Sequence, residues 1–599
     1  MKPKIGLEIH QQLDCGKLFC NCPCQIGEGK PDFTVKRQLR LSTGELGSVD
    51  AAAAHEVAKN KTFIYNCFNK SICLVELDEE PPHPPNKTAM NIALNVARIL
   101  NAKICERIVV MRKIVLDGSN TSGFQRTMLV GYNGFIELSN KKVRISTICL
   151  EEDAAKIVER KPNYDIYNLS RLGIPLIEIS TEPDITSGKM CKLVAEHLGF
   201  LLRSLPHMKR GIGTIRQDVN VSIHGGRRVE IKGAQNLRHL DLLVDNEIKR
   251  QQRLLEWKSI AKGIVMEEPV DVTSLFTGTE CKLIRKALQK KRKVWAARLV
   301  KAKAKLDFEL SPNHRIGTEL SDYAKVKAGI GGLFHSDELP RYGISEAEIT
   351  KLRKKLKCKY EDGFIIIADS EGKLAKAFNA IIERLKEIKK GVPSEVRRAK
   401  RDATTSYLRP MPGHARMYPE TDLPLIKPEL KEISTKTLTE IREELLNQFN
   451  LSSDLANAVI KSRKASFIYD MIRHYKGELK PSFIAETILK ARKEIKKQFD
   501  KDIEISDRVL NELFGLIAKG TIPKDAVFEV LAKADEKPLK DIAKSYKALE
   551  ESGLRDVVRQ IIKQNPNASF NALMGIAMSK LKGKVAGSKV AVIIREMLK

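Results

Sequence analysis

The chain has 599 residues, of which 42% are hydrophobic and 30% are charged. This composition is typical of a folded globular protein and excludes a largely disordered one. Apolar runs stay well below the ~18 residues that a membrane helix needs. The opening sequence, MKPKIGLEIH, also lacks the apolar core of a secretory signal. We therefore expect several domains in a cytoplasmic protein with no membrane segment.

Positive charge is in excess, because 105 Lys and Arg against 75 Asp and Glu give a formal net charge of +30. Such an excess favours a polyanionic partner, most simply nucleic acid, although a generally Lys-rich proteome gives the same balance. Between Lys282 and Lys305 there are eleven basic residues and no acid. Apolar residues from Leu283 to Trp295 recur there at roughly helical spacing. The pattern predicts a basic amphipathic helix suited to a phosphate backbone.

The first predicted element is a strand with the sequence IGLEIHQQL. Alternation along a strand sends Ile5, Leu7 and Ile9 to one face. The same alternation sends Glu8 and His10 to the other face. A carboxylate beside an imidazole can be an ordinary solvated surface or part of a site, and partners from other stretches must decide between the two.

The chain has eleven cysteines, and an odd number argues against a disulfide framework. Cys20 and Cys22 form a C-x-C pair, and Cys67 and Cys73 form a C-x5-C pair. Two such pairs can close around one zinc ion in a tetrahedral thiolate site. The spacing differs from the usual C-x2-C, and buried reduced thiols are the alternative.

Several later stretches supply partners for the first strand. MRKIVLDGSNTSGFQRT contributes Lys113 among other polar side chains. LEEDAAK ends an apolar strand with three acids, Glu151 to Asp153, and we expect a helix to start there, since acids complement the dipole at a helix N-terminus. Glu178 lies within the apolar run IPLIEIS. An unpaired carboxylate there would cost several kcal/mol, so a cation or a donor must accompany it.

Two further strands repeat the pattern of the first. In GIGTIRQDVNVSI, Arg216 and Asp218 share one face, and in VEIKG, Glu230 and Lys232 share one face. Strand faces that alternate acids and bases are typical of a site for a metal-bound nucleotide. Carboxylates and an imidazole hold Mg²⁺ there, while Lys and Arg hold the phosphates. No P-loop, H-E-x-x-H or G-x-S-x-G motif occurs, so any phosphoryl transfer must use another scaffold.

Changes of composition along the chain predict its domains. Residues 1–267 mix short β-rich runs with helical stretches, which indicates an α+β catalytic body. Residues 268–395 form a more basic α/β module, and polar turn chemistry returns at 396–427. Helical periodicity with short Gly- and Pro-containing turns then predicts two all-helical domains, 428–505 and 506–599. The expected fold class is therefore multidomain α+β followed by all-α domains.

These motifs together resemble the GatB/GatE family over essentially the whole chain. The resemblance rests on GLEIHQQL, LDGSNTSGFQRT, EEDAAK, LSRLGIPLIEIS, GIGTIRQDVNVSI and VEIKG. It implies a catalytic cradle domain at 1–267 and 396–427. RIGTELSDYAK and GLFHSDELPRYGI, within 268–395, resemble an insertion that bacterial-type aspartyl-tRNA synthetases also carry and that separates the E branch of the family from the B branch. LFGLIAKGTIPKDAVFEVL and NPNASFNALMGIAMSKLKGK resemble the family's helical tail.

The resemblance implies an ATP-dependent amidotransferase, which is a carbon–nitrogen ligase. Its synthetase-like subunit phosphorylates the side-chain carboxylate of glutamate esterified to tRNA(Gln), and ammonia then displaces phosphate to leave Gln-tRNA(Gln). The acyl phosphate supplies the leaving group that a carboxylate lacks, and magnesium neutralises the phosphate charge. An RNA-binding scaffold without chemistry is the alternative, but such a scaffold has no use for Glu178 in an apolar run.

The roles of individual residues follow from the same resemblance. The expected Mg²⁺ ligands are His10, Glu152 and Glu178, with Glu8 and Glu151 as further candidates; the expected phosphate clamps are Lys113, Arg216 and Lys232; Asp218 and Glu230 are expected to carry a second metal or to guide ammonia. Cys73 is followed by Leu-Val-Glu, whereas many bacterial relatives have a second C-x2-C. This departure leaves the zinc site open.

We find no glutaminase machinery in the sequence. The resemblance therefore implies an asparaginase-like amidase subunit, D, as the source of ammonia, in a heterotetramer of two D subunits and two copies of this chain. The nucleic-acid partner would be tRNA(Gln) charged with glutamate. Lys580, Lys582, Lys584 and Lys589 surround a Gly-x-x-Gly-like turn in the tail. They can be a solvated basic surface, but the resemblance implies that the tail grips the outer corner of the tRNA.

Overall fold

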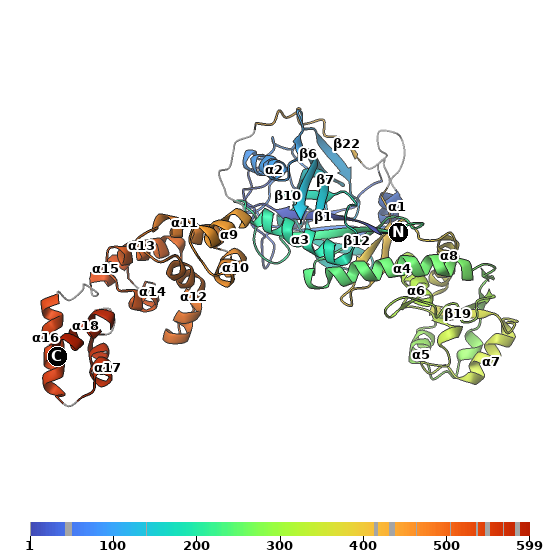
Figure 1. Cartoon of the computed structure of the whole chain (residues 1–599). Coiled ribbons are helices and arrows are strands. Elements are labelled where there is room, and N and C mark those ends of the chain that lie inside the picture. The colour runs from blue at the N-terminus through green and yellow to red at the C-terminus, as the bar shows by residue number, and fades with distance from the viewer. Residues whose placement is uncertain are drawn as a thin grey trace. The chain divides into compact units, whose positions relative to one another are not determined.

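The computed structural model divides into two compact units, Met1–Ser434 and Thr435–Lys599. Each unit is described by itself. The described residues are 2–41, 51–138, 141–412, 417–429, 438–462, 464–503, 505–534, 537–544, 551–566, 568–581 and 587–598. The architecture is mixed α+β in the first unit and helical in the second (Figure 1), which agrees with the expected fold class at this level.

A large sheet of eleven strands dominates the described part of the first unit. Its order is β21-β20-β12-β11-β1-β10-β7-β6-β5-β22, with β4 paired to β6. The strands are β1 (Lys4–Gln12), β4 (Lys103–Ile104), β5 (Val110–Ile114), β6 (Phe124–Leu138), β7 (Lys141–Glu152), β10 (Pro175–Thr181), β11 (Ile215–Ser222), β12 (Val229–Lys232), β20 (Glu395–Ala399), β21 (Thr405–Pro410) and β22 (Met417–Pro419). β12 and β20 run parallel, and the other pairs are antiparallel.

The predicted alternation of the first strand is confirmed. Ile5, Leu7 and Ile9 are at most 1% exposed and belong to the main hydrophobic core. Three helices cover this side: α2 (Lys87–Ile99) packs on β6 and β7, α3 (Gly188–Arg203) on β1, and α4 (Leu240–Ile260) on β11 and α3. Glu8 and His10 therefore lie on the sheet face away from the core.

One predicted boundary near the acidic run is wrong. β7 ends at Glu152 as expected, but a helix does not follow, because the next element is strand β8 (Lys156–Arg160). β8 belongs to a smaller sheet of order β2-β3-β9-β8, with β2 (Phe33–Arg37), β3 (Thr62–Cys67) and β9 (Tyr164–Asn168). A short helix, α1 (Ala51–Val57), lies between β2 and β3 in the chain. The acids therefore end a strand and do not cap a helix.

The basic run from Lys282 to Lys305 is likewise not one helix. Helix α5 ends at Gln289, and the chain continues as strand β15 after Arg292. Trp295 thus lies in a strand, where Val294, Ala296 and Ala297 are buried. The region holds a sheet of order β13-β15-β19-β18, with β14 paired to β15, and a two-stranded ribbon. Its elements are β13 (Val265–Met266), β14 (Val270–Asp271), α5 (Lys282–Gln289), β15 (Lys293–Val300), β16 (Glu309–Ser311), β17 (His314–Arg315), α6 (Ile316–Ala328), β18 (Phe334–His335), α7 (Glu346–Lys355), β19 (Gly363–Asp369) and α8 (Glu371–Lys389).

A buried ion cluster ties α6 and α8 to α4 and β20. Its members are Glu247, Arg250, Glu319, Arg384, Glu395 and Arg397, each at most 2% exposed. Arg384 Nη1 donates to Glu395 Oε2 at 2.6 Å, and Arg397 Nη1 donates to Glu319 Oε1 at 3.0 Å. Arg250 donates twice to the Glu247 carboxylate at 2.9 Å. Removing one member would leave an uncompensated buried charge, so the cluster holds this α/β region firmly on the large sheet.

The second unit is helical throughout its described elements. These are α9 (Leu438–Asn447), α10 (Ser453–Lys461), α11 (Ala465–His474), α12 (Pro481–Phe499), α13 (Asp507–Ala518), α14 (Val527–Lys533), α15 (Leu539–Lys544), α16 (Glu551–Gln564), α17 (Phe570–Leu581) and α18 (Gly587–Met597). α12 packs on α14, and the Tyr475 and Phe483 rings contact the Phe514 ring, so helices on both sides of residue 505 share one core. α16–α18 have a separate core. Among the described helices of the whole chain, we find no stretch with the length and apolarity to cross a membrane.

Candidate active site

The site forms around β1, which lies between β10 and β11. The antiparallel register places His10 opposite both Glu178 on β10 and Arg216 on β11, and it places Glu8 opposite Asp218 on β11. Residues opposite each other in antiparallel strands project from the same face of the sheet. The register therefore brings together residues that are more than 200 positions apart in the sequence.

His10, Glu151 and Glu178 form the first group of possible metal ligands. One donor atom from each residue lies within 4.8 Å of the others. His10 Nε2 is 3.0 Å from Glu178 Oε2, so the predicted proximity of these two residues is confirmed. Lys113 Nζ lies 3.0 Å from Glu151 Oε1 and 3.8 Å from Glu178 Oε2. The ammonium thus contacts both carboxylates and partly balances their charge.

Glu152, which the sequence analysis proposed as a metal ligand, is not in this group. It neighbours Glu151 in β7, and successive strand residues point to opposite faces. Its Oε1 accepts a hydrogen bond from the Arg126 backbone N–H at 2.9 Å and lies 3.5 Å from Arg126 Nη1. Burial raises the pKa of the Glu152 carboxyl even though Arg126 opposes the shift. Glu151, a further candidate from the sequence, lies beside His10 and Glu178 where Glu152 was expected.

Glu8, Asp218 and Glu230 form a second group, again with one oxygen from each within 4.8 Å of the others. Lys232 Nζ contacts two of them, at 2.8 Å from Asp218 Oδ2 and 2.7 Å from Glu230 Oε1. The Gly233 backbone N–H donates to Asp218 Oδ1 at 2.9 Å. The group has oxygen ligands throughout, which is the donor set that Mg²⁺ prefers in proteins.

Burial and the neighbouring charges together shift the pKa values of the members of the two groups. Burial raises the pKa of Glu8 to about 7, and the charges of Glu178 and Glu230 add to the shift. Burial also opposes ionisation of Glu178, but Lys113 and the hydrogen bond with His10 outweigh it and hold the pKa of Glu178 well below its usual range. For His10, contact with Glu178 outweighs burial and raises the pKa. Both shifts favour the charged forms, so they favour an ion pair between His10 and Glu178.

Arg216 is already engaged by a third carboxylate. Its Nη2 donates to Asp153 Oδ1 at 2.7 Å, and Arg171 Nε lies 3.7 Å from Asp153 Oδ2. Burial would raise the pKa of Asp153, but the two guanidinium groups outweigh it and lower the pKa. The register places Arg216 opposite His10 of the first group, and the Asp153 carboxylate holds its guanidinium there.

A cavity of about 290 Å³ adjoins the second group and includes Lys232 in its lining. Arg398 and Arg409 line the same cavity. We find no ion pair between either guanidinium and a carboxylate in the described ranges. Neither residue was expected from the sequence, although the first of them lies in the basic run RRAKR at 397–401, which could have indicated it.

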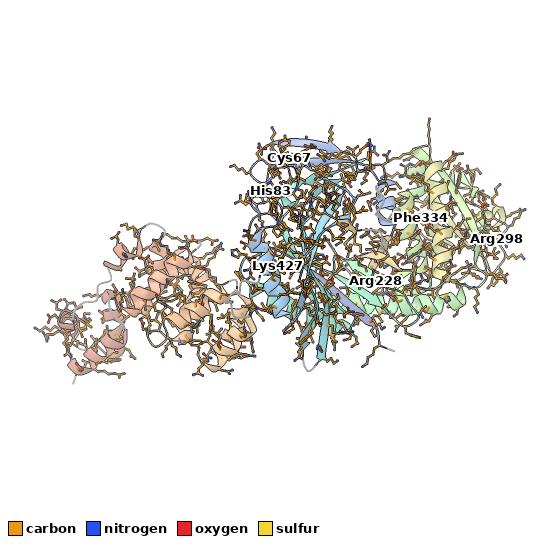
Figure 2. All side chains as sticks on the ribbon, turned by 90° about the horizontal axis from the view of Figure 1, so that it is seen from above. Cys67, His83, Arg228, Arg298, Phe334 and Lys427 are labelled. Atoms are coloured by element: carbon orange, nitrogen blue, oxygen red, sulfur yellow. The ribbon has the colours of Figure 1, made fainter. Side chains whose placement is uncertain are left out.

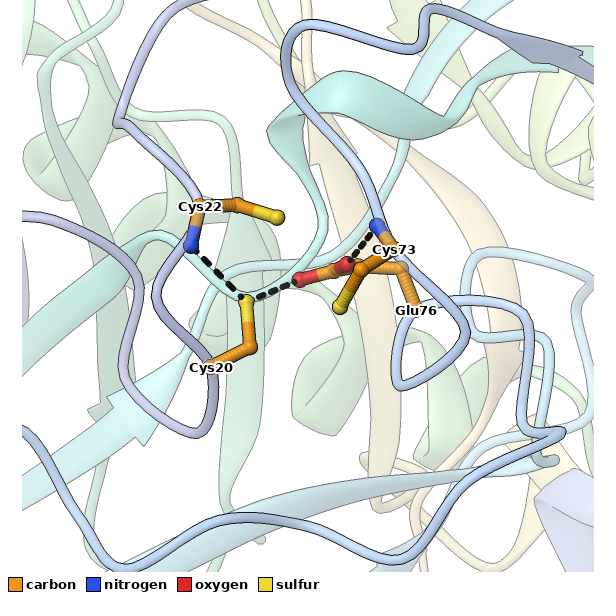
Figure 3. A group of neighbouring side chains, drawn as sticks. All are labelled: Cys20, Cys22, Cys73 and Glu76. Atoms are coloured by element: carbon orange, nitrogen blue, oxygen red, sulfur yellow. Dashed lines mark hydrogen bonds between the residues drawn. The ribbon is translucent and has the colours of Figure 1, made fainter.

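The cysteine cluster brings together Cys20, Cys22, Cys73 and Glu76, with one donor atom from each within 4.8 Å of the others. Cys20 Sγ donates to Glu76 Oε1 at 2.9 Å, and the Cys73 N–H donates to Glu76 Oε2 at 2.8 Å. Figure 3 marks both hydrogen bonds with dashed lines. Cys67, an expected member, is not part of this group. Cys67, labelled in Figure 2, is the last residue of β3, and its Sγ lies 3.5 Å from the Tyr65 carbonyl oxygen. All eleven cysteines are free thiols, as the odd count predicted.

The tail lysines are only partly within the described structure. Lys580, in α17, is exposed, with its Nζ 3.5 Å from Gln564 Oε1. Lys582 and Lys584 lie outside the described residues. Lys589 lies in α18, but its side chain is outside the described part. The RNA-binding role of these lysines stays a prediction.

Comparison with known proteins places this geometry in context. A family model of the GatB/GatE catalytic domain matches residues 3–434, and a model described as a GatB domain matches residues 467–598. The chain belongs to the GatB/GatE family. Both carboxylate groups, the cysteine cluster and the cavity beside Lys232 fall within the part that matches the GatB/GatE catalytic domain.

Curated relatives match the chain over nearly its whole length. A protein of Methanocaldococcus jannaschii is 45% identical over 620 residues, covering 100% of this chain and 98% of the relative. Proteins of Sulfurisphaera tokodaii and Thermococcus gammatolerans are 42% and 40% identical, each covering 99% of this chain and 98% of the relative. All three are named as the E subunit of glutamyl-tRNA(Gln) amidotransferase. The GatB/GatE chain is thus similar to these relatives from end to end.

The raised pKa of Glu8 predicts a pH-dependent stability of the metal-free protein. The folded state keeps a proton on Glu8 up to about pH 7, whereas an ordinary glutamate releases it near 4.5, so stability falls as pH rises through this window. Glu8→Gln removes that loss. We expect it to raise the free energy of unfolding by on the order of 2–3 kcal/mol at pH 8 and by little near pH 4.5.

Urea unfolding with a chelator present, at both pH values, measures this difference. The exposed glutamate variant Glu361→Gln is the matched control and should show no such pH dependence. A gain from Glu8→Gln that is equal at the two pH values would contradict the assignment.

Proposed function

We propose that this chain is the synthetase-like subunit of an amidotransferase that converts Glu-tRNA(Gln) to Gln-tRNA(Gln) with ATP. The observation that carries the proposal is the pair of carboxylate groups on the face of β1 away from the core, one around His10 and one beside Lys232. The names of the full-length relatives support the substrate. ATP would phosphorylate the glutamate side chain, and ammonia would then displace phosphate.

The residues of both groups fit divalent metal ions. Carboxylates at the site outnumber the Lys and Arg side chains that contact them, since Glu8, Glu151, Glu178, Asp218, Glu230 and Asp153 face Lys113, Arg216, Arg171 and Lys232. His10, Glu151 and Glu178 would hold one Mg²⁺, and Glu8, Asp218 and Glu230 a second. Mg²⁺ bound by these residues would supply positive charge that neutralises the phosphates.

Cations of this chain complete the phosphate site. Lys113 and Lys232 each contact two carboxylates, so their charge becomes available to phosphate once the carboxylates bind metal. Arg398 and Arg409 line the cavity beside Lys232 and suit bidentate contacts with phosphate oxygens. Arg216, whose guanidinium is held by Asp153, would contact phosphate at the edge of the site.

The second half-reaction needs an acceptor for the proton that ammonia loses as the amide forms. In the alternative in which the second group holds no metal, Glu8, with a pKa of about 7, has the proton affinity for that role near neutral pH. Asp218 and Glu230 would then guide ammonia instead of carrying a second metal. We propose that ammonia comes from an asparaginase-like amidase subunit, D, in a heterotetramer of two D subunits and two copies of this chain, in the cytoplasm.

The domain assignment is part of the proposal. Residues 1–267 and 396–427 would form the catalytic cradle, and 268–395 an insertion domain like that of bacterial-type aspartyl-tRNA synthetases. The parallel pairing of β12 with β20 and the buried ion cluster around Arg384 support one continuous cradle interrupted by an insertion. A helical domain and a tRNA-binding tail would follow.

A pair of neighbouring glutamates tests the site. We expect Glu151→Gln to raise the Mg²⁺ concentration needed for activity at least about tenfold, because a charged ligand is lost. Glu152→Gln should leave the Mg²⁺ requirement unchanged and lower stability by about 1–3 kcal/mol, because Arg126 loses a buried partner. The assay is ATP hydrolysis by the chain with its amidase partner, with and without Glu-tRNA(Gln).

Wild-type hydrolysis that is independent of Glu-tRNA(Gln) would contradict the proposed function. Equal Mg²⁺ titrations for Glu151→Gln and wild type, together with a shifted titration for Glu152→Gln, would restore the assignment made from the sequence.

We also propose that Cys20, Cys22, Cys73 and Glu76 bind one zinc ion. Lys17 supports this, because its fully buried Nζ lies 3.2 Å from Glu76 Oε1 and has no hydrogen bond to a described residue. Three thiolates and one carboxylate exceed the charge of Zn²⁺ by two, and a buried ammonium compensates part of that excess. The ion would cross-link the loops that carry these residues.

Metal analysis of the purified chain tests the zinc site. We expect about one zinc per chain in wild type and in Cys67→Ser, and loss of zinc in Cys20→Ser and Glu76→Gln. Zinc retained by Glu76→Gln but lost from Cys67→Ser would return Cys67 to the ligand set. Wild-type protein without zinc after expression with the metal would identify the cluster as reduced thiols.

Removal of α16–α18 tests the tail. Truncation after Lys544 is preferable to truncation at 505, since α12–α14 pack across that point whereas α16–α18 have their own core. We expect affinity for tRNA(Gln) to fall about tenfold or more and its salt dependence to flatten as phosphate contacts are lost. Ammonia production by the partner should persist. Unchanged affinity and salt slope in a binding titration would exclude RNA binding by this segment.

A further inference from the structure

A second basic cavity lies in the α/β region, away from the carboxylate groups. Its volume is about 260 Å³, and its lining comes from α5, the loop after α6, β18 and the end of β19. Lys286, Lys290 and Arg292 contribute its positive charge. Neither carboxylate group shares a residue with its lining.

The lysines at this cavity lack carboxylate partners. Lys286 and Lys290 of the lining are exposed, as are the neighbouring Lys282 and Lys291, and within the described ranges we find no ion pair for any of the four. Arg292 differs, since its Nη1 lies 3.0 Å from Asp369 Oδ1. Unpaired ammonium groups on one helix and the turn after it form a local positive field that attracts a polyanion.

The cavity also has an apolar part. Leu283 is 66% exposed on α5, although its neighbour Ile284 is buried in the local core. Phe334, labelled in Figure 2, lines the cavity, and its ring centroid is 5.6 Å from that of Tyr342. An anion with a flat apolar group could pair its charge with the lysines and pack its flat group against this apolar lining.

Gly331 contributes to the lining of the cavity without a side chain. A Cβ placed on Gly331 would meet no atom within 4 Å, and its backbone conformation is not one that disfavours side chains. A larger side chain can therefore be added to the lining at this position without a clash at its Cβ.

We propose that this surface, formed by α5 and the loop at Gly331, is a second RNA contact, in which the lysines bind the phosphodiester backbone and the cavity accepts one unstacked nucleotide. The inference rests on the proposed function, which supplies tRNA as a partner. An RNA strand combines regularly spaced phosphates with a flat ring on every nucleotide, whereas the acidic side chains of a peptide carry no ring that could contact Phe334 and Leu283.

Charge removal tests the backbone contact. Lys286→Gln with Lys290→Gln should weaken tRNA(Gln) binding to the full chain with its amidase partner. The slope of log affinity against log salt should become less steep by about two, since each lost phosphate contact removes nearly one. The matched control is Lys351→Gln with Lys354→Gln, which removes two exposed charges from α7 of the same region.

Filling the cavity tests the nucleotide. Gly331→Val adds no charge, so it should weaken tRNA binding about tenfold while leaving the salt slope unchanged. Gly372→Val is its control, because this exposed glycine of α8 also has open space around a Cβ and lies outside the cavity. For both cavity variants, KM for Glu-tRNA(Gln) should rise with kcat preserved.

The outcomes separate this inference from the proposed function. If wild type fails to amidate Glu-tRNA(Gln), the proposed function is wrong whatever the variants do. If wild type is active but the lysine variant keeps its affinity and slope, or Gly331→Val keeps its affinity, the RNA contact is wrong. Loss of amidase binding by the lysine variant, with tRNA binding intact, would identify a protein interface and overturn the inference.

Discussion

The register of β1 between β10 and β11 is the constraint on which the candidate site depends. It sets Ile5, Leu7 and Ile9 into the core, and this burial fixes the strand against a one-residue slip, because a slip would move every apolar side chain to the other face. With the core side fixed, Glu8 and His10 must project from the opposite face. Burial of the apolar side chains on one face of β1 thus determines where the polar side chains of Glu8 and His10 lie.

Electrostatic balance explains why these acids can share one face before any ligand binds. Lys113 and Lys232 each contact two carboxylates, and His10 pairs with Glu178. The compensation is incomplete at Glu8, which burial and neighbouring charges keep protonated to about pH 7. Residual repulsion between the carboxylates favours the binding of a divalent cation, because the metal ion relieves that repulsion.

Much of the fold and the site followed from alternation along strands, and the failures have physical reasons. The faces of β1, β11 and β12 were predictable because apolar and polar residues alternate there. Glu151 and Glu152 could not be told apart, since adjacent acids at a strand end give no sign of which face is which. Glu76 could not be predicted as a partner of Cys20, because the folding of two loops that are distant in sequence brings its carboxylate near the thiol. The run from Lys282 to Lys305 was wrongly predicted as one helix, because helix α5 and strand β15 are both rich in basic residues.

The buried ion cluster has a consequence for how such a chain can change during evolution. Glu319 and Arg384 lie on α6 and α8, whereas Glu247, Arg250, Glu395 and Arg397 lie on α4 and β20. Counting carboxylates and guanidinium groups, each set is neutral by itself. A lineage that gains or loses α6 and α8 therefore leaves no net charge stranded in the interior. The ion cluster therefore holds α6 and α8 firmly on the large sheet, and its charge balance still allows the two helices to be gained or lost together.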